Sequence, residues 1–254
     1  MKKLYFFLKK ELFESWRTSR CLILLIIFLI IGLMNPLLAK LLPEIIKQTI
    51  GEGLANTLAE PTSFDSWTQF YKNYPQTGLI VLALMFSGIV SNEINKGTLI
   101  NLVTKGLRRW TVIIGKLLSL VIQWTLCLTV TFLVTWFYTQ YYFPDNQSPH
   151  PFQAVFPLWI FQLLLVGLIL FTSTIARNNY EGLLLSGGVI LLFILLSVVK
   201  KLKYLNPLSL VTQNLVFLQK DAVVSDYWPA MLLSVLLFVL FVSLSIAIFN
   251  QKKL

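Results

Sequence analysis

Long apolar runs separated by short polar segments dominate the pattern of this chain. Six runs approach or exceed the length needed to cross a bilayer, and polar and apolar residues do not alternate within them. Because backbone groups in lipid must form their hydrogen bonds internally, such runs are expected to be helices. The pattern predicts an all-α polytopic membrane protein with six spans at about 21–39, 77–90, 110–138, 157–176, 182–199 and 228–250. The second span is short, so its flanks are expected to complete it.

Residues 1–20 precede the first span and have helical periodicity. Their apolar residues recur every three to four positions, whereas Lys10 and Arg17 fall on an opposing polar side. The apolar set is Leu4, Leu8, Leu12 and Trp16. The spacing predicts an amphipathic helix in the inner membrane interface, and a basic anchor without a helix of its own is the alternative.

Two longer segments are expected outside the membrane, at about 40–76 and 200–227. The first contains an aromatic set at helical spacing after the possible cap Ser63, namely Phe64, Trp67, Phe70 and Tyr71. One interpretation is that this outer helix lines an exit route for an apolar cargo. The other is that it anchors the loop among the headgroups, where Trp and Tyr are common.

A charged insert, Ser91–Lys116, separates the second and third apolar runs. Its first part has the pattern of a short helix over residues 93–105, and Gly106 is a plausible stop after it. Arg108 and Arg109 then precede Trp110, which is the order of a basic inner flank and an interfacial aromatic. We therefore interpret the insert as a docking element that faces the cytoplasm.

Charge supports this topology. With the amino terminus inside, 14 of the 21 Lys and Arg residues and 4 of the 11 acidic residues fall on cytoplasmic segments. That asymmetry follows the positive-inside rule and places both termini in the cytoplasm. The net charge of +10 is thus explained by a membrane setting, and no nucleic-acid partner is expected.

Residues for catalysis or metal binding do not cluster in this sequence. His150 is the only histidine, Cys21 and Cys127 lie at different depths, and no ionisable residue falls at the centre of a span. The phosphate-binding pattern G-x-x-x-x-G-K-[ST] is also missing. We therefore expect no catalytic site, no metal and no cofactor in this chain.

The insert carries Glu93-x-x-x-Gly97-Thr98, then a leucine-rich turn, a basic pair and Gly115-Lys116. In this it resembles the first cytoplasmic loop of the permease subunits of type-2 (type V fold) ABC exporters, and the six-span layout agrees. The resemblance implies that residues 93–105 form the coupling helix, which docks on a separate ATPase. The docking residues it implies are Glu93, Lys96, Gly97, Thr98, Leu99, Leu102, Val103 and Lys105.

The resemblance also implies the function and the partners. An ABC ATP-binding subunit would hold ATP and Mg, a second permease would complete a homodimer, and an amphipathic peptide or lipid-like cargo would leave a bacterial cell through the plasma membrane. Within the family, the chain resembles small Gram-positive exporters, among them the Pmt system for phenol-soluble modulin peptides. A non-transporting membrane scaffold or immunity protein is the alternative, and a lipid-modifying enzyme is a weaker one.

Overall fold

The computed structural model describes residues 2–50, 60–99, 104, 106–145, 147–148, 150–199, 204–218 and 227–252, apart from the side chains of 46, 47, 49 and 50. Within these ranges the regular structure is helical, and six helices are long and apolar enough to cross a membrane. The predicted fold class and the number of spans are therefore confirmed. The spanning helices are α2 (Arg20–Ile50), α4 (Ser63–Phe86), α7 (Arg109–Tyr142), α8 (Pro151–Ile175), α9 (Asn179–Ser197) and α12 (Trp228–Gln251).

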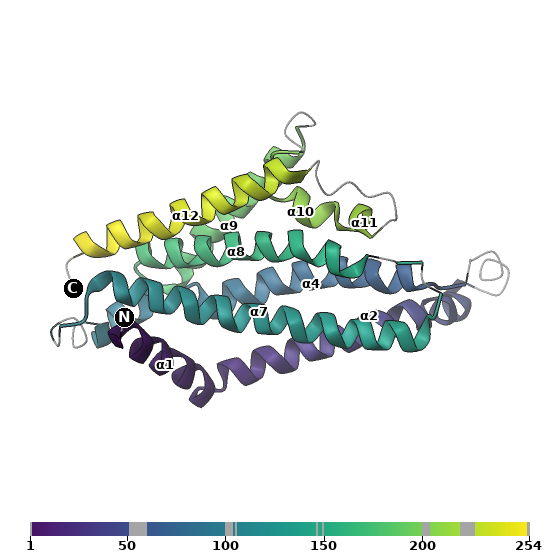
Figure 1. Cartoon of the computed structure of the whole chain (residues 1–254), viewed down its shortest axis with the longest axis horizontal. Coiled ribbons are helices and arrows are strands. Elements are labelled where there is room, and N and C mark those ends of the chain that lie inside the picture. The colour runs from purple at the N-terminus through teal and green to yellow at the C-terminus, as the bar shows by residue number, and fades with distance from the viewer. Residues whose placement is uncertain are drawn as a thin grey trace.

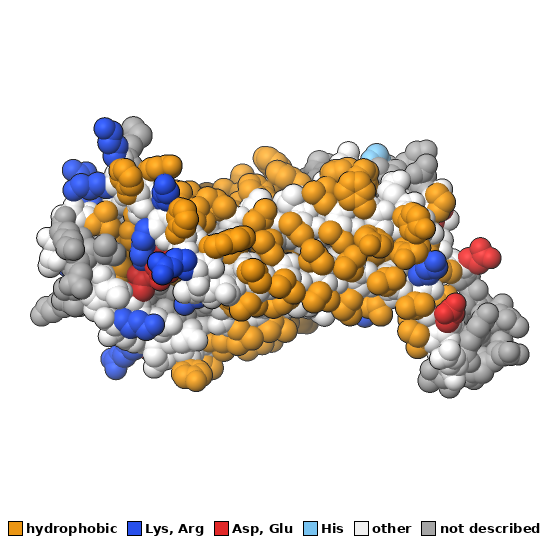
Figure 2. Space-filling view, turned by 90° about the horizontal axis from the view of Figure 1, so that it is seen from below, with side chains coloured by type: hydrophobic (Ala, Val, Ile, Leu, Met, Phe, Trp, Pro, Cys, Tyr) orange, Lys and Arg blue, Asp and Glu red, His pale blue; other side chains and the backbone are white. Residues whose placement is uncertain are grey.

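The spans form one elongated bundle, with both termini at the same end (Figure 1). We call this end the terminal end and the opposite one the far end. The helix α8 is the most buried span and packs against α12 and α9, while α2 packs against α7 and α4. Figure 2 shows an apolar belt across the middle of one face of the bundle and charged side chains gathered near its ends. Such a belt between two charged ends is the surface expected of a multi-pass membrane protein.

The helix α2 continues past the predicted end of the first span. Pro36 and Pro43 both lie inside it, whereas the first span was predicted to end at about residue 39 and an outer segment to begin at residue 40. Proline lacks the N–H that would bond to the carbonyl four residues earlier, which here belongs to Gly32. The Thr135 hydroxyl on α7 donates to that carbonyl at 3.1 Å. A neighbouring helix thus satisfies the freed group, and α2 continues.

The second span is completed by its outer flank. The helix α4 begins at Ser63, so the predicted outer helix and the short second span are one continuous element. Because α2 extends to Ile50, helices make up most of the predicted outer segment at 40–76. Thr62, rather than Ser63, precedes the helix, and Asp65 accepts hydrogen bonds from its N–H at 2.8 Å and its hydroxyl at 3.0 Å. Asp145 accepts from the Ser63 N–H at 2.8 Å, which joins this helix start to the turn after α7.

Within its described residues, 204–218 and 227, the predicted outer segment at 200–227 contains two short helices, α10 (Ser209–Thr212) and α11 (Asn214–Phe217). Both pack against α8, and Leu210, Phe217 and Leu218 are buried. The segment therefore packs on α8 within the protein and does not lie only against lipid.

The amino-terminal segment forms α1 (Lys2–Arg17), which confirms a helix there and rules against the anchor without one. Its protein-facing side differs from the predicted apolar stripe: Phe7, Glu11 and Ser15 are buried, whereas Trp16 is exposed. The exposed side carries Tyr5, Phe6, Phe13 and Trp16, all of them more than half exposed. Aromatic rings on the outer side are typical of a helix that lies at the membrane interface.

Candidate functional site

The insert, Ser91–Lys116, begins with a helix much shorter than predicted, and from Arg109 onward it belongs to α7. The helix α5 covers Ser91–Asn95, and Gly97 then has a φ of 67°. A single helix from Glu93 to Lys105 is therefore wrong at its start, because a residue in the left-handed region ends α5. A new helical segment includes Thr98 and Leu99, and Gly106 has the positive φ, 82°, of a helix-terminating glycine.

The predicted docking residues of the insert face in different directions. Lys96 and Thr98 are exposed, Gly97 is half-buried and Leu99 is fully buried. Glu93 retains 18% exposure and points into the protein. Leu102, Val103 and Lys105 lie outside the described residues. Of these docking residues, Lys96 and Thr98 thus lie on the exposed surface, together with Asn92 and Asn95, while Glu93 belongs to an internal contact.

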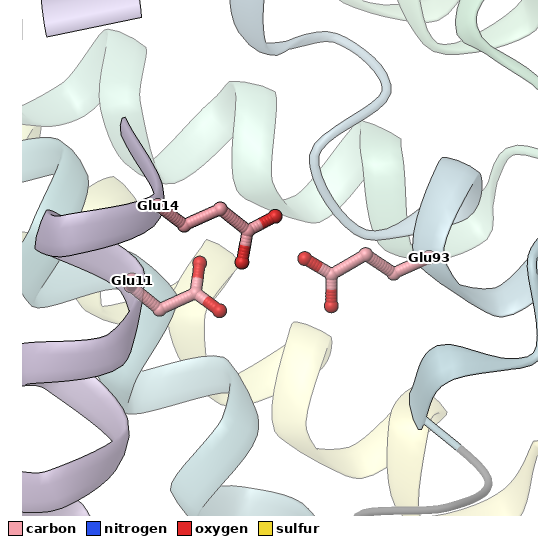
Figure 3. A group of neighbouring side chains, drawn as sticks. All are labelled: Glu11, Glu14 and Glu93. Carbon is pink, nitrogen blue, oxygen red and sulfur yellow. The ribbon is translucent and has the colours of Figure 1, made fainter. Parts of the chain in front are cut away.

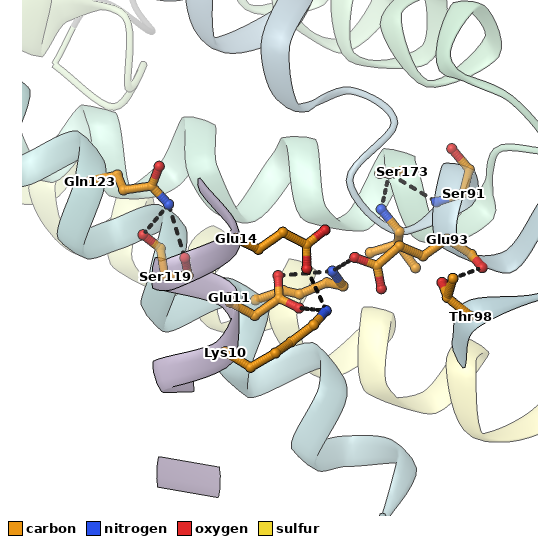
Figure 4. Close-up of polar contacts among 11 residues, drawn as sticks. Lys10, Glu11, Glu14, Ser91, Glu93, Thr98, Ser119, Gln123 and Ser173 are labelled. Carbon is orange, nitrogen blue, oxygen red and sulfur yellow. Dashed lines mark hydrogen bonds and ion pairs between the residues drawn. The ribbon is translucent and has the colours of Figure 1, made fainter. Parts of the chain in front are cut away.

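That internal contact is an ion-pair cluster around Lys116 of α7. The Lys116 side chain has no exposed surface, and its ammonium donates to Glu11 of α1 at 3.0 Å and to Glu93 of α5. Figure 4 shows the polar contacts that surround Glu11 and Glu93. One buried cation therefore joins three elements that are far apart in the sequence. Removing a partner from such a cluster leaves an uncompensated buried charge, which is strongly destabilising.

Lys10 and Glu14 form a second layer beside this cluster. The Lys10 ammonium lies 2.7 Å from Glu14 and 3.0 Å from Glu11. Burial by itself would lower the pKa of Lys10, but the hydrogen bond to Glu14 and the nearby carboxylates outweigh it and raise that pKa. Burial would likewise raise the pKa of Glu14, but the hydrogen bond from Lys10 and its positive charge outweigh the effect of burial. The pKa of Glu14 is therefore lowered. Both groups are therefore charged at neutral pH.

Three carboxylates of this region point toward one another: Glu11, Glu14 and Glu93, with oxygens within 4.8 Å (Figure 3). Such a set has the ligand chemistry of a cation site. Here the ammonium groups of Lys10 and Lys116 already lie against these oxygens and supply the positive charge. We therefore interpret the group as a structural ion-pair network.

The other side of α5 is held by α8 and α9. The Ser173 hydroxyl accepts from the backbone N–H of Val90 at 2.9 Å, and the Asn95 amide donates to the Arg177 carbonyl at 2.6 Å. The Ser87 hydroxyl donates to Asn179 at 2.6 Å. Movement of α5 would therefore act on the α8–α9 turn as well as on α1 and α7.

Sequence reasoning missed Glu11 and did not assign a role to Lys116. Two signals were available: a lysine inside an apolar run, and the spacing of Phe7, Glu11 and Ser15, which places them on one side of a helix. Gly115 completes the fit, because a Cβ at this position would lie 2.3 Å from the Phe7 ring. The missing side chain allows α1 to lie close to α7.

The four aromatic residues proposed for an exit route are mostly inside the bundle. Trp67, Phe70 and Tyr71 are buried, and Trp67 packs against Phe132 of α7 at a ring distance of 5.2 Å. Of the four, Tyr71 also lines a groove of about 500 Å³ between α4, α8, α9, α10 and α11. The set therefore builds the core near the far end, and the interpretation as a headgroup anchor is wrong for the three buried rings.

Comparisons with known proteins agree with the architecture. The family model described as "ABC-2 family transporter protein" matches residues 6–254, nearly the whole chain. A comparison with curated proteins found no match. The family consists of transporter membrane subunits that are not themselves catalytic and that work with an ABC ATP-binding partner. With six apolar helices and a match over nearly its full length, this chain belongs to the ABC-2 transporter family and is a multi-pass membrane protein.

Proposed function

We propose that this chain is the permease subunit of an ATP-driven exporter, and that a separate ATPase docks on the insert at the terminal end. The family match together with the insert carries the proposal: a short exposed segment connects, through buried contacts, to α1, α7, α8 and α9. In this proposal the terminal end faces the cytoplasm, and ATP and Mg are bound by the ATPase.

The contacts of α5 suggest how docking would move the membrane helices. A push on α5 would reach α7 and α1 through the Glu93–Lys116–Glu11 cluster, and the α8–α9 turn through Ser173 and Arg177. Buried ion pairs resist separation, so the connected helices would move with α5. ATP shifts such an equilibrium only by favouring one state of the complex over another.

For the cargo, we propose an amphipathic peptide or a lipid-like molecule, moved out of a bacterial cell through a homodimer of this chain. The groove beside Tyr71 supports an apolar cargo, because aliphatic residues such as Leu79, Ile194 and Leu215 line it. Apolar burial would supply the binding energy at roughly 25 cal/mol per Å². Similarity to the exporters of phenol-soluble modulin peptides is part of this proposal.

Affinity purification of the tagged chain from its native membrane tests the docking, with detection of co-purifying ATPase and nucleotide-dependent ATP hydrolysis. Lys96→Glu reverses an exposed charge of the insert, and Glu60→Arg is a matched control at the far end. Lys96→Glu should reduce ATPase recovery or its stimulation, and Glu60→Arg should not. A chain that purifies without any ATP-binding protein would contradict the proposal and favour the scaffold alternative.

A further inference from the structure

A cavity of about 380 Å³ opens at the terminal end between α1, the start of α2, the end of α4 and α5. Its walls combine charged and amide side chains with a few apolar ones. The lining residues are Lys10, Glu14, Arg20, Met85, Gly88, Ile89, Asn92, Glu93, Lys96 and Thr98. The volume is within the range of small-molecule sites.

We propose that this cavity binds the phosphate headgroup of an anionic phospholipid. The inference does not depend on transport. It shares Lys96 with the surface proposed for ATPase docking, so Arg20, which belongs to α2, is the residue that tests the lipid site separately. The inference follows from three properties of the cavity: its charge, its depth in the membrane and the apolar surface beside it.

Charge pairing leaves two cations available. Lys10 is paired with Glu11 and Glu14, and Glu93 is paired with Lys116. Among the residues that the structure describes, neither Arg20 nor Lys96 has an ion-pair partner within 4.0 Å, although Arg20 contributes at longer range to the lowered pKa of Glu14. The guanidinium of Arg20 and the ammonium of Lys96 are therefore donors for phosphate oxygens.

The two carboxylates in the lining do not oppose this assignment. Each already accepts from a lysine, Glu14 from Lys10 and Glu93 from the buried Lys116. The lining contains three cations against two carboxylates, and behind it the opposite charges of Lys116 and Glu11 offset each other. Figure 2 shows acidic side chains at this end surrounded by Lys and Arg. An anion that enters the cavity therefore meets an excess of positive charge.

The depth is that of lipid headgroups. Arg20 begins α2 immediately before the apolar run, and Met85 lies in the last turn of α4. Beside the cavity, α1 exposes aromatic rings, as interfacial helices do. The boundary between the apolar belt and the charged end thus passes through the cavity.

Exposed apolar residues lie on the same helices as the cavity lining. Met85 and Ile89 form the apolar part of the lining, and Ile23 and Leu84 are exposed on the adjoining helices at 46% and 60%. Acyl chains can lie along this surface while the phosphate remains between Arg20 and Lys96. That combination favours a phospholipid over a soluble anion or an acidic segment of a protein.

Native mass spectrometry of the full chain, purified in mild detergent and titrated with phosphatidylglycerol or phosphatidylcholine, tests the proposal. Arg20→Gln and Lys96→Gln should each weaken retention of phosphatidylglycerol roughly tenfold, about 1.4 kcal/mol, and Arg20→Lys should retain most of it. Arg17→Gln is the matched control, because Arg17 is exposed on α1 and does not line the cavity. Equal melting temperatures would show that the variants fold.

Several results would overturn the proposal. Equal retention of both lipids, or no effect of Arg20→Gln and Lys96→Gln, would exclude an anionic headgroup site. An equal loss in Arg17→Gln would indicate diffuse attraction to a basic surface. Displacement by millimolar inorganic phosphate would identify a site for free anions instead. Loss of lipid when the ATPase is bound, with an acidic residue of that subunit cross-linked to Lys96, would identify a protein-docking cavity.

Discussion

The ammonium of Lys116 lies 3.0 Å from the carboxylate of Glu11, although the two residues are 105 positions apart and belong to different helices. Because Lys116 is completely buried, its charge depends on Glu11 and Glu93 for compensation. The amino-terminal helix is therefore attached to the bundle at the same point that holds α5.

Replacement of Lys116 by methionine should destabilise the protein. The variant keeps the bulk of the side chain but leaves Glu11 and Glu93 without their shared cation, a change that costs about 3–5 kcal/mol in buried pairs. Thermal unfolding in detergent measures it. Lys116→Arg should lose less stability than Lys116→Met, because it keeps the positive charge. Adding Glu11→Gln to Lys116→Met should restore part of the lost stability. Equal melting temperatures for Lys116→Met and the wild type would show that the cluster does not stabilise the fold.

Gly115→Ala should loosen the contact between α1 and α7. The added Cβ would lie 2.3 Å from the Phe7 ring, so either α1 or the Phe7 ring has to shift. Such a shift costs about 1–3 kcal/mol of stability. Gly188→Ala in α9 is the matched control, since a Cβ there has no atom within 4 Å. Limited proteolysis near residue 18 and the melting temperature both report the change. If Gly115→Ala behaves like the control, the close approach of α1 is not required.

The hydrogen bond between Thr135 and Gly32 should depend on Pro36. Thr135→Val removes the hydroxyl that satisfies the Gly32 carbonyl and should cost about 1 kcal/mol. In a Pro36→Ala background the restored N–H can bond to the same carbonyl, so Thr135→Val should cost less. A double-mutant cycle from melting curves measures this coupling. Strictly additive effects would mean that the hydroxyl does not compensate for the proline.

Acid should weaken the contact between the α7–α8 turn and the start of α4. Burial would raise the pKa of Asp145, but hydrogen bonds from Ser63 and Gln147 outweigh it and lower that pKa below its usual 3.8. A lowered folded-state pKa means that the stability is present above the unfolded value and is lost as the pH falls through the folded value.

Asp145→Asn tests that prediction. Because Asp145 is largely exposed, we expect a loss of at most about 1 kcal/mol at pH 7, or roughly 2–4 °C in melting temperature. The difference between variant and wild type should shrink as the pH falls from 5 to below 3. A constant difference over that range would show that the charge of Asp145 does not matter.

The candidate site was only partly accessible to sequence reasoning. The insert was recognised because charged residues between two apolar runs are conspicuous, and Gly106 was expected to end a helix there, in agreement with its positive φ. The inward direction of Glu93 was not predicted, because a motif on a short helix does not reveal which side of that helix contacts the rest of the protein. The break at Gly97 was missed for a related reason, since glycine is also tolerated within helices.

The sequence by itself determined the six membrane helices and the helical amino-terminal segment. Those properties depend on local hydrophobicity and periodicity, and a bilayer leaves helices as the solution for such runs. Only the tertiary structure decided that α2 continues through Pro36, that the aromatic residues of α4 are core, and that Lys116 pairs with Glu11 and Glu93. Each of these depends on partners contributed by distant segments, whose hydrogen bonds, packing and charges become available once the helices have assembled.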